Sequence, residues 1–492
     1  MTGPKRRDKI SALAAAAFCS AAAALFTAAA LWKTEADPDL FGYLAFGRLY
    51  FSGGAFPYHD VFSYLPVRPV WVYHEWLTGV VLFRVLTGFG PEGLQVLRWA
   101  LGLSALWLCA RAAQRLGAGL VPVCLTLFLC VNIWAAGYNP VRAQVFTYLF
   151  FAASLYLAVR ARESAWASWL FVPLTLLWQN LHGGFPAGIA LFLLCAVFAR
   201  GVRLRFLLPA LASLCLVWVN PYGFSYYPYM AEALTFPRAE IGEWLPLWKA
   251  LAVGYPLSAA ACYLLLAALA VLLFRKASWQ PEEAAVLAGT FLAGLLVIRH
   301  QVFFALCGLA FLPPALDRPV RSYGKPVLAV LVAALLANGY AFAVQARLAL
   351  DRKNPLALTT PACPEQACTS VAFPVEAVTY LRQRGFTGKI VTDFAWGEYV
   401  LWKLWPECRV ALDGRYDTVF PKEICREYLD FVLGKPDGRE FLVRYPPDAV
   451  LTRIGSDVDS RMRFLPGWVL AHSDCASALF LREAGKRKPS KK

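Results

Sequence analysis

Long apolar stretches recur along most of this 492-residue chain. Eleven of them are candidate membrane spans, because a helix needs about 20 mainly apolar residues to cross a hydrocarbon core. They lie near residues 10–32, 92–112, 119–136, 143–160, 166–181, 184–200, 206–220, 256–274, 282–299, 302–316 and 326–346. Charged residues make up only 16% of the chain, against about 25% in soluble domains. The pattern predicts a polytopic α-helical membrane protein.

Basic residues predict how the spans are oriented. Every second loop carries arginine or lysine, namely Arg111 and Arg115, Arg160 and Arg162, Arg200, Arg203 and Arg205, Arg275 and Lys276, and Arg318, Arg321 and Lys325. The alternate connections at 137–142, 181–183 and 300–301 hold few charges. Since arginine and lysine mark cytoplasmic loops, we expect the amino terminus inside and the tail outside. The formal charge of +16 then comes largely from basic residues in short loops that orient the spans. This distribution disfavours nucleic-acid binding, because a nucleic-acid-binding protein would cluster its positive charge on one soluble face.

Two stretches near the amino terminus each allow two structural interpretations. Residues 10–32 resemble a cleaved signal peptide in their alanine content, but signal cores are shorter, about 7–15 residues. Residues 76–90 are short and contain Arg84, so we expect an interfacial helix there. The first outer loop is then 33–91.

The tail changes character and alternates strand and helix patterns. Expected strands lie at 389–394, 409–413, 449–453, 468–472 and 477–481, with helices at 375–384, 397–404, 422–433 and 456–464. Such alternation predicts a soluble α/β domain with a mainly parallel sheet. The expected domains are therefore a transmembrane domain, 1–349, an extracytoplasmic α/β domain, 350–485, and a basic disordered tail, 486–492.

The cysteines are divided between the apolar stretches and the tail. Eight of the 13 cysteines lie in apolar stretches and five in the tail. Cys363 and Cys368 are close in sequence, so we expect them to form a disulfide if the tail lies outside the cytoplasm. A zinc site is the weaker alternative, because no histidine is near this pair.

Polar side chains gather at the outer ends of the expected spans and in the first outer loop. In the loop these are Asp37, Asp39, His74 and Glu75, and at the span ends Arg142, Asn180, His182, Asn220, Arg299 and His300, while Glu243 lies in the outer loop that Asn220 opens. Polar groups beside spans are functional candidates by default. Single positions also have structural explanations. Asn220 suits a turn, His182 or Asp37 a helix cap, and Arg299 can reach the headgroups.

Carboxylates and arginines at one membrane face suit a reaction on a lipid phosphate. Arginine binds phosphate oxygens through a planar fork of donors. A carboxylate can remove a proton from an attacking hydroxyl or bind a divalent ion that neutralises a leaving phosphate. Transfer of a sugar from a polyprenyl phosphate uses both functions.

The chain resembles the GT-C superfamily of integral membrane glycosyltransferases, which includes protein O-mannosyltransferases and aminoarabinose transferases of lipid A. The resemblance rests on the topology and on the acidic start of the first outer loop, Asp37-Pro38-Asp39. More closely, the chain is similar to bacterial polytopic membrane proteins of unassigned substrate. The shared motifs appear here as Trp71-Val-Tyr-His74-Glu75-Trp76, Trp178-Gln-Asn180-Leu-His182-Gly, Asn220-Pro-Tyr-Gly223, Trp396-Gly-Glu-Tyr and Leu412-Asp413-Gly414-Arg415.

This resemblance implies a polyprenyl-phosphate-linked sugar donor and a bacterial inner membrane location. It implies a base or metal-binding aspartate in the first loop, and by position this is Asp37 or Asp39. We expect Asp37 to be the catalytic carboxylate, with Asp39, Glu75 or Glu243 as its helper, and Mg²⁺ or Mn²⁺ as the ion if one takes part. The span-end residues, Glu243 and His74 would bind substrate, while the acceptor stays open. The rival hypotheses are a transporter or flippase and a non-catalytic component of envelope polysaccharide assembly.

Overall fold

The computed structural model describes residues 34–138, 141–235, 241–274, 279–322, 357–363, 371–435 and 438–483, besides the single positions 21, 27 and 347. The expected first and last spans and the basic tail lie outside these residues. The chain divides into two compact units. The helical unit comprises Met1–Thr34, Gln95–Phe224 and Pro237–Ala357, and the mixed unit comprises Glu35–Leu94, Ser225–Phe236 and Leu358–Lys492.

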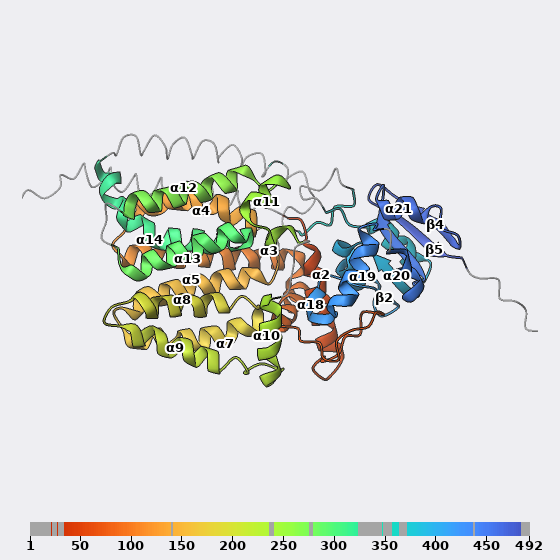
Figure 1. Cartoon of the computed structure of the whole chain (residues 1–492), viewed down its shortest axis with the longest axis horizontal. Coiled ribbons are helices and arrows are strands. Elements are labelled where there is room, and N and C mark those ends of the chain that lie inside the picture. The colour runs from red at the N-terminus through yellow and green to blue at the C-terminus, as the bar shows by residue number, and fades with distance from the viewer. Residues whose placement is uncertain are drawn as a thin grey trace, which may run out of the picture. The chain divides into compact units, whose positions relative to one another are not determined.

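The helical unit consists of apolar helices that run alongside one another (Figure 1). They are the second part of α3 (Trp76–Arg115), α4 (Leu120–Tyr138), α5 (Gln144–Ala161), α6 (Ala165–Trp169), α7 (Phe171–Leu181), α8 (Pro186–Phe198), α9 (Arg203–Cys215), α11 (Leu247–Ala252), α12 (Leu257–Phe274), α13 (Pro281–Leu296) and α14 (Gln301–Ser322). Short 3₁₀ turns are η1 (Gly223–Ser225), η2 (Gly242–Trp244) and η3 (Ile298–His300).

Among the described residues, five helices are long and apolar enough to cross a membrane. They contain Trp76–Arg115, Leu120–Gly137, Gln144–Ala161, Leu257–Phe274 and Ile298–Asp317. The expected count of eleven is therefore not established. The stretch expected at 166–181 is divided between α6 and α7, and α7, α8 and α9 have 11–13 residues each. At 1.5 Å per residue they are about 16–20 Å long, shorter than a 30 Å hydrocarbon core.

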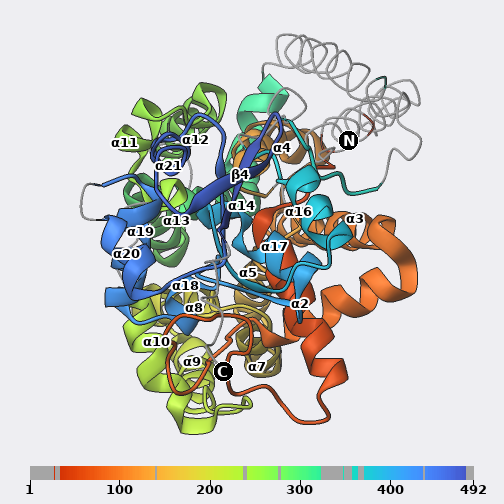
Figure 2. The same cartoon turned by 90° about the vertical axis from the view of Figure 1, so that its right-hand side faces the viewer.

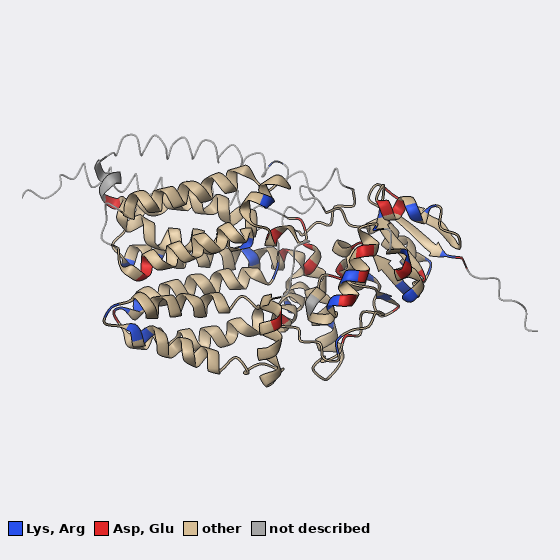
Figure 3. Ribbon diagram, viewed as in Figure 1, with Lys and Arg blue, Asp and Glu red and all other residues tan. Residues whose placement is uncertain are grey.

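Charged groups lie at the ends of these helices and leave their middles apolar (Figure 3). At the carboxyl end of α5, Arg162 pairs with Glu282 at 3.1 Å and with Glu283 at 2.7 Å. At its amino end lies Arg142, which pairs with Glu243 at 3.3 Å. Since α5 has 18 residues, these two charged groups are about 27 Å apart along its axis. That separation is close to the thickness of a hydrocarbon core.

The mixed unit combines a five-stranded sheet with helices. The strands are β1 (Gly388–Thr392), β2 (Cys408–Val410), β3 (Ala449–Arg453), β4 (Trp468–Ser473) and β5 (Ser477–Arg482). The helices are α2 (Pro38–Ser52), the first part of α3, α10 (Tyr226–Thr235), α16 (Val375–Gln383), α17 (Gly397–Leu404), α18 (Tyr416–Val419), α19 (Lys422–Val432), α20 (Arg439–Arg444) and α21 (Asp457–Met462), with the 3₁₀ turn η5 (Phe394–Trp396).

The sheet has the order β2-β1-β3-β5-β4 and is only partly parallel. β2, β1 and β3 pair in parallel, whereas β5 is antiparallel to both β3 and β4. The expectation of a mainly parallel sheet is therefore wrong for the β4–β5 half. Only residues 474–476 separate these strands, and so short a connection forms an antiparallel hairpin. All five strands and the helices at 375–384, 397–404, 422–433 and 456–464 occur close to their expected positions.

Segments of the first loop pack into the same unit as the tail. Helix α2 is buried along Leu40–Gly47 on all its faces, as expected of a helix enclosed by protein. Figure 2 shows it beside α17, and the Phe41 ring packs edge-on against Tyr399 at 5.0 Å. Ser63 forms a parallel bridge with Val410 and so extends the edge of β2.

The helix expected at 76–90 is the first part of α3. Gly90 has φ of 70° and interrupts the helix immediately before Pro91. Positive φ is readily adopted by glycine, so the kink separates this segment from the long apolar part of α3.

The disulfide prediction is wrong in its partner. Cys363 is bonded to Cys475, with their Cα atoms 5.3 Å apart and a sequence separation of 112. The loop between β4 and β5 brings Cys475 to the start of the tail. Cys368 lies outside the described residues.

Candidate functional site

A cavity of about 180 Å³ opens among the helix ends of the helical unit. Its wall combines two arginines, a glutamate and two tyrosines with apolar side chains. The lining residues are Ile133, Ala136, Gly137, Arg142, Gln144, Val145, Tyr148, Glu243, Tyr255, Ile298, Arg299 and Val302. Arg142 and Arg299, expected at separate span ends, and Glu243, expected in an outer loop, therefore meet at one place.

Glu243 connects the two arginines of this cavity. Its Oε1 accepts from Arg299 Nη1 at 2.7 Å, and its Oε2 accepts from Arg142 Nη1 at 3.3 Å. The guanidinium of Arg299 lies over the Trp244 ring, 5.3 Å from its centroid. The Glu243 side chain is 31% exposed and each arginine 20%. Two positive charges thus face one negative charge in a partly enclosed space.

His300 is beside this cavity but does not line it. Its ring packs against Trp244 at 6.2 Å and Phe303 at 6.0 Å. The sequence predicts that His300 binds substrate. In the structure its neighbour Arg299, and not His300 itself, lines the cavity.

The remaining span-end candidates bind nearby backbone or side chains. Asn180 donates to the carbonyls of Leu176 and Val219 at 2.8 and 3.1 Å. Asn220 accepts the amide of Tyr222 at 2.8 Å and forms a turn. These contacts supply partners for backbone groups that helix ends leave unsatisfied.

His182 ends α7 and closes a buried network. Its Nδ1 accepts the amide of Gly184 at 2.8 Å and lies 2.6 Å from Thr147 Oγ1. Trp178 Nε1 donates to the same hydroxyl at 2.7 Å. The arrangement supports the helix-end explanation for His182.

In the mixed unit, the two aspartates of the first loop have different surroundings. Asp37 is the N-cap of α2, and its Oδ1 accepts the amide of Asp39 at 3.0 Å. Asp39 follows Pro38 in the first turn, and its Oδ1 faces Gly414. Asp37 therefore holds the helix start, while Asp39 reaches toward the tail segments of its unit.

Glu398 on α17 meets Asp39 at this point. It accepts the amide of Gly42 at 3.1 Å, and any side chain on Gly42 would collide with its carboxyl group. A Cβ placed on Gly414 would be 3.0 Å from Glu398 Oε1 and 3.1 Å from Asp39 Oδ1. Two carboxyl groups thus surround one position, although they are far apart in sequence.

The environment of Glu398 favours its neutral form. Burial raises the pKa of Glu398 well above its usual range, the charges of Asp39 and Asp413 raise it further, and Arg415 offsets part of the effect. A protonated carboxyl group is a hydrogen-bond donor as well as an acceptor. A buried carboxyl group with a raised pKa therefore lies next to the aspartate of the first loop.

Arg415 joins the first loop to the tail through a buried ion cluster. Its Nε and Nη2 donate to the two oxygens of Asp413 at 2.8 and 2.7 Å, and its Nη1 donates to Asp60. The rings of Phe62 and Trp71 each lie 4.9 Å from the guanidinium carbon. Such a cluster fixes the local geometry, because each charge depends on its partners.

His74 and Glu75 lie together in the same unit. His74 Nε2 is 3.6 Å from Glu75 Oε1, and its Nδ1 is 2.7 Å from the Tyr229 hydroxyl on α10. The pair is partly buried, with 21% and 13% of the side chains exposed.

Sequence reasoning did not select Asp60, Glu398, Asp413 or Arg415 as site residues. All four belong to motifs or pairs that are visible in the sequence, namely His59-Asp60, Trp396-Gly-Glu398 and Leu412-Asp413-Gly414-Arg415. Their mutual proximity depends on pairing between the first loop and the tail, and no local pattern indicates that pairing.

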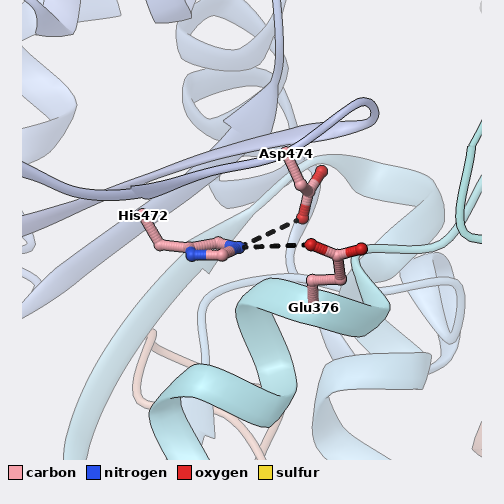
Figure 4. A group of neighbouring side chains, drawn as sticks. All are labelled: Glu376, His472 and Asp474. Atoms are coloured by element: carbon pink, nitrogen blue, oxygen red, sulfur yellow. Dashed lines mark ion pairs between the residues drawn. The ribbon is translucent and has the colours of Figure 1, made fainter.

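One group among the described residues has the spacing of a metal site, and it contains neither Asp37 nor Asp39 (Figure 4). Glu376, His472 and Asp474 place one ligand atom each within 4.8 Å of one another. His472 Nε2 is 4.0 Å from Glu376 Oε2 and 3.5 Å from Asp474 Oδ2. Glu376 is largely exposed, and the same distances suit an ion pair with a protonated histidine.

The chain has the fold of known membrane glycosyltransferases. No protein-family model and no curated protein matches its sequence. ArnT from Cupriavidus metallidurans bound to undecaprenyl phosphate aligns with a TM-score of 0.57 and 14% identity over 95% of this chain and 98% of ArnT. The oligosaccharyltransferase AglB from Archaeoglobus fulgidus, in complex with an inhibitory peptide and a dolichol-phosphate, gives 0.52 and 12% over 89% of this chain and 69% of AglB.

The mycobacterial arabinofuranosyltransferase AftD gives a TM-score of 0.55 and 16% identity over 99% of this chain and 42% of AftD. The three proteins are GT-C glycosyltransferases, so the expected GT-C-like fold is confirmed. An alignment over 95% of the chain necessarily includes most of the tail. The mixed unit is therefore part of what is similar.

Proposed function

We propose that this protein is a membrane glycosyltransferase that moves a sugar from a polyprenyl-phosphate donor to an extracytoplasmic acceptor. The observation that carries the proposal is the cavity with Arg142 and Arg299 at the ends of apolar helices. The fold likeness to ArnT bound to undecaprenyl phosphate supports it. Arginine forks match phosphate oxygens, and the adjoining helices would hold the isoprenoid chain.

In the proposed reaction, an acceptor hydroxyl oxygen attacks the anomeric carbon of the sugar. The bond from that carbon to the phosphate oxygen breaks, and the polyprenyl phosphate leaves with the electron pair. The hydroxyl proton passes to a carboxylate. Arg142 and Arg299 stabilise the charge that grows on the phosphate.

Asp39 is the better candidate for this carboxylate, and Asp37 and Glu75 are the alternatives. Asp37 caps a helix through the Asp39 amide, whereas Asp39 adjoins the buried acid Glu398. If Mg²⁺ or Mn²⁺ takes part, Asp37 and Asp39 are the candidates to hold it, because hard cations prefer carboxylate oxygens. Such an ion supplies neutralisation of a leaving phosphate.

The proposed location is a bacterial inner membrane with the amino terminus cytoplasmic and 350–485 as an extracytoplasmic domain. Cysteines introduced at Lys325 and Gly385 should then react with a membrane-impermeant reagent from opposite sides. Labelling of both from one side would contradict this orientation.

The activity test uses the purified full chain in nanodiscs with undecaprenyl-phosphate-linked pentoses and hexoses that carry a radiolabel. Binding and sugar release should weaken by at least tenfold in Arg299→Lys, because the ammonium keeps the charge but loses the fork. Arg200→Lys changes an exposed loop arginine in the same way and serves as the control. Equal effects of the two substitutions would assign Arg299 to headgroup contact, and donor movement without sugar release would favour a flippase.

A further inference from the structure

We infer that Glu243 is an internal anion that occupies the position of the donor phosphate between Arg142 and Arg299, and that it leaves this position when the donor binds. The inference rests on the proposed function, since it assigns phosphate to the same two arginines. It changes the expected role of Glu243 from a group that binds substrate to one that competes with it.

The first argument is the way the carboxylate is held. Each oxygen of Glu243 takes one Nη1 donor from a different arginine, at 2.7 and 3.3 Å. A phosphate presents oxygens to arginine forks in the same manner. Carboxylate and phosphate therefore compete for these two Nη1 groups.

The second argument is charge. The negative charge of Glu243 faces both arginines of the cavity. A phosphate that entered beside an unmoved Glu243 would meet a like charge in a poorly solvated space, which costs free energy. Exchange avoids this cost, because the displaced carboxylate can return to water.

The third argument is space and mobility. The cavity of about 180 Å³ exceeds the 150 Å³ or so that holds a benzene ring, so a phosphate group fits. Glu243 lies in the three-residue turn η2, and its side chain is 31% exposed. The backbone of this turn is fixed by the bond from the Ile298 amide to the Leu245 carbonyl at 3.1 Å. A rotation of the side chain is then enough for the exchange.

Trp244 keeps Arg299 in position when the Glu243 carboxylate leaves. Its ring lies against the Arg299 guanidinium at 5.3 Å, and such cation–π contact persists without the carboxylate. Arg299 therefore stays oriented toward the cavity while Glu243 moves.

The test is the affinity for undecaprenyl phosphate, measured by titration of the full chain in nanodiscs. Glu243→Gln removes the charge and keeps the shape, so the dissociation constant should fall by about 10- to 150-fold, the factor that corresponds to one hydrogen bond to a charged group. Glu243→Asp is too short to bridge both arginines and should give a smaller gain. Unchanged or weaker binding in both variants would overturn the inference and assign Glu243 to positioning the arginines.

Two controls separate this inference from the proposed function. Glu163→Gln removes a negative charge from an exposed pair with Arg115 in the same unit, and it should leave the affinity unchanged. An equal gain in this variant would show a general effect of net charge and overturn the inference. Arg142→Ala and Arg299→Ala should each weaken binding. If they do not, the donor site itself is misassigned, whatever Glu243 does.

Discussion

Arg415→Met tests whether the first loop and the tail are held together by the buried ion cluster. Arg415 is 3% exposed and donates to both oxygens of Asp413 and to Asp60. Methionine fills much of the space against Phe62 and Trp71 but leaves two buried carboxylates without their cation. Removing one partner of a buried pair costs about 3–5 kcal/mol.

This loss converts into a large change in melting temperature. For a unit of roughly 150–250 residues, each kcal/mol lowers Tm by about 2–4 °C, so we expect a decrease of about 6–20 °C. The assay is tryptophan fluorescence of the detergent-solubilised chain at a fixed heating rate, because large proteins often unfold irreversibly. Arg409→Met is the matched control, since Arg409 lies exposed on the neighbouring strand β2.

A second substitution identifies the cause of the loss. Asp60→Asn in the Arg415→Met background removes one uncompensated charge and should recover part of the lost Tm, whereas Asp60→Asn alone should lower it. Such opposite signs are the mark of coupled residues. If Arg415→Met lowers Tm no more than Arg409→Met, the cluster does not stabilise the unit and the reasoning fails.

Three further predictions concern the same unit. Asp39→Asn should lose about 10²–10⁴-fold in turnover, as expected for a general base, while Asp37→Asn keeps most of it because asparagine caps helices about as well; the reverse result would return the base to Asp37. Burial and neighbouring carboxylates raise the pKa of Glu398, so the folded wild type binds a proton that the unfolded chain releases, and its stability falls as pH rises above about 4.5. Glu398→Gln does not lose stability in this way, so the Tm of the variant minus the Tm of the wild type should increase from pH 5 to 9. A constant difference between the two Tm values would contradict the raised pKa of Glu398. Alkylation without reductant should leave Cys363 and Cys475 unmodified in protein taken from the envelope, and their labelling would exclude the bond.

The local patterns of the tail predicted its elements because each strand buries a short apolar segment. β3 is buried over four of its five residues and β5 over four of its six, so both are visible as apolar runs between turn residues. The alternation of strands and helices predicts a parallel sheet, whereas β4 and β5 are antiparallel. Their direction follows from the short connection between them, which allows only a hairpin.

Contacts between distant segments were not predictable in this way. Asp60 and Arg415 are 355 residues apart, and neither segment carries a periodicity that points to the other. The cysteine prediction failed for the same reason, since it used closeness in sequence, whereas the fold brings Cys363 to Cys475. By contrast, Arg142, Glu243 and Arg299 were all selected, because charged groups beside apolar helices are costly and therefore few.

The polar residues at the span ends differ in the groups that their hydrogen bonds contact. Asn180 and Asn220 bind carbonyls and amides at the ends of short helices, so the fold already accounts for them. Arg142 and Arg299 are different, because two cations share one carboxylate beside an open cavity. Both arginines therefore line a space that a phosphate group can enter, and this is why the phosphate site is assigned to that cavity rather than to the asparagines.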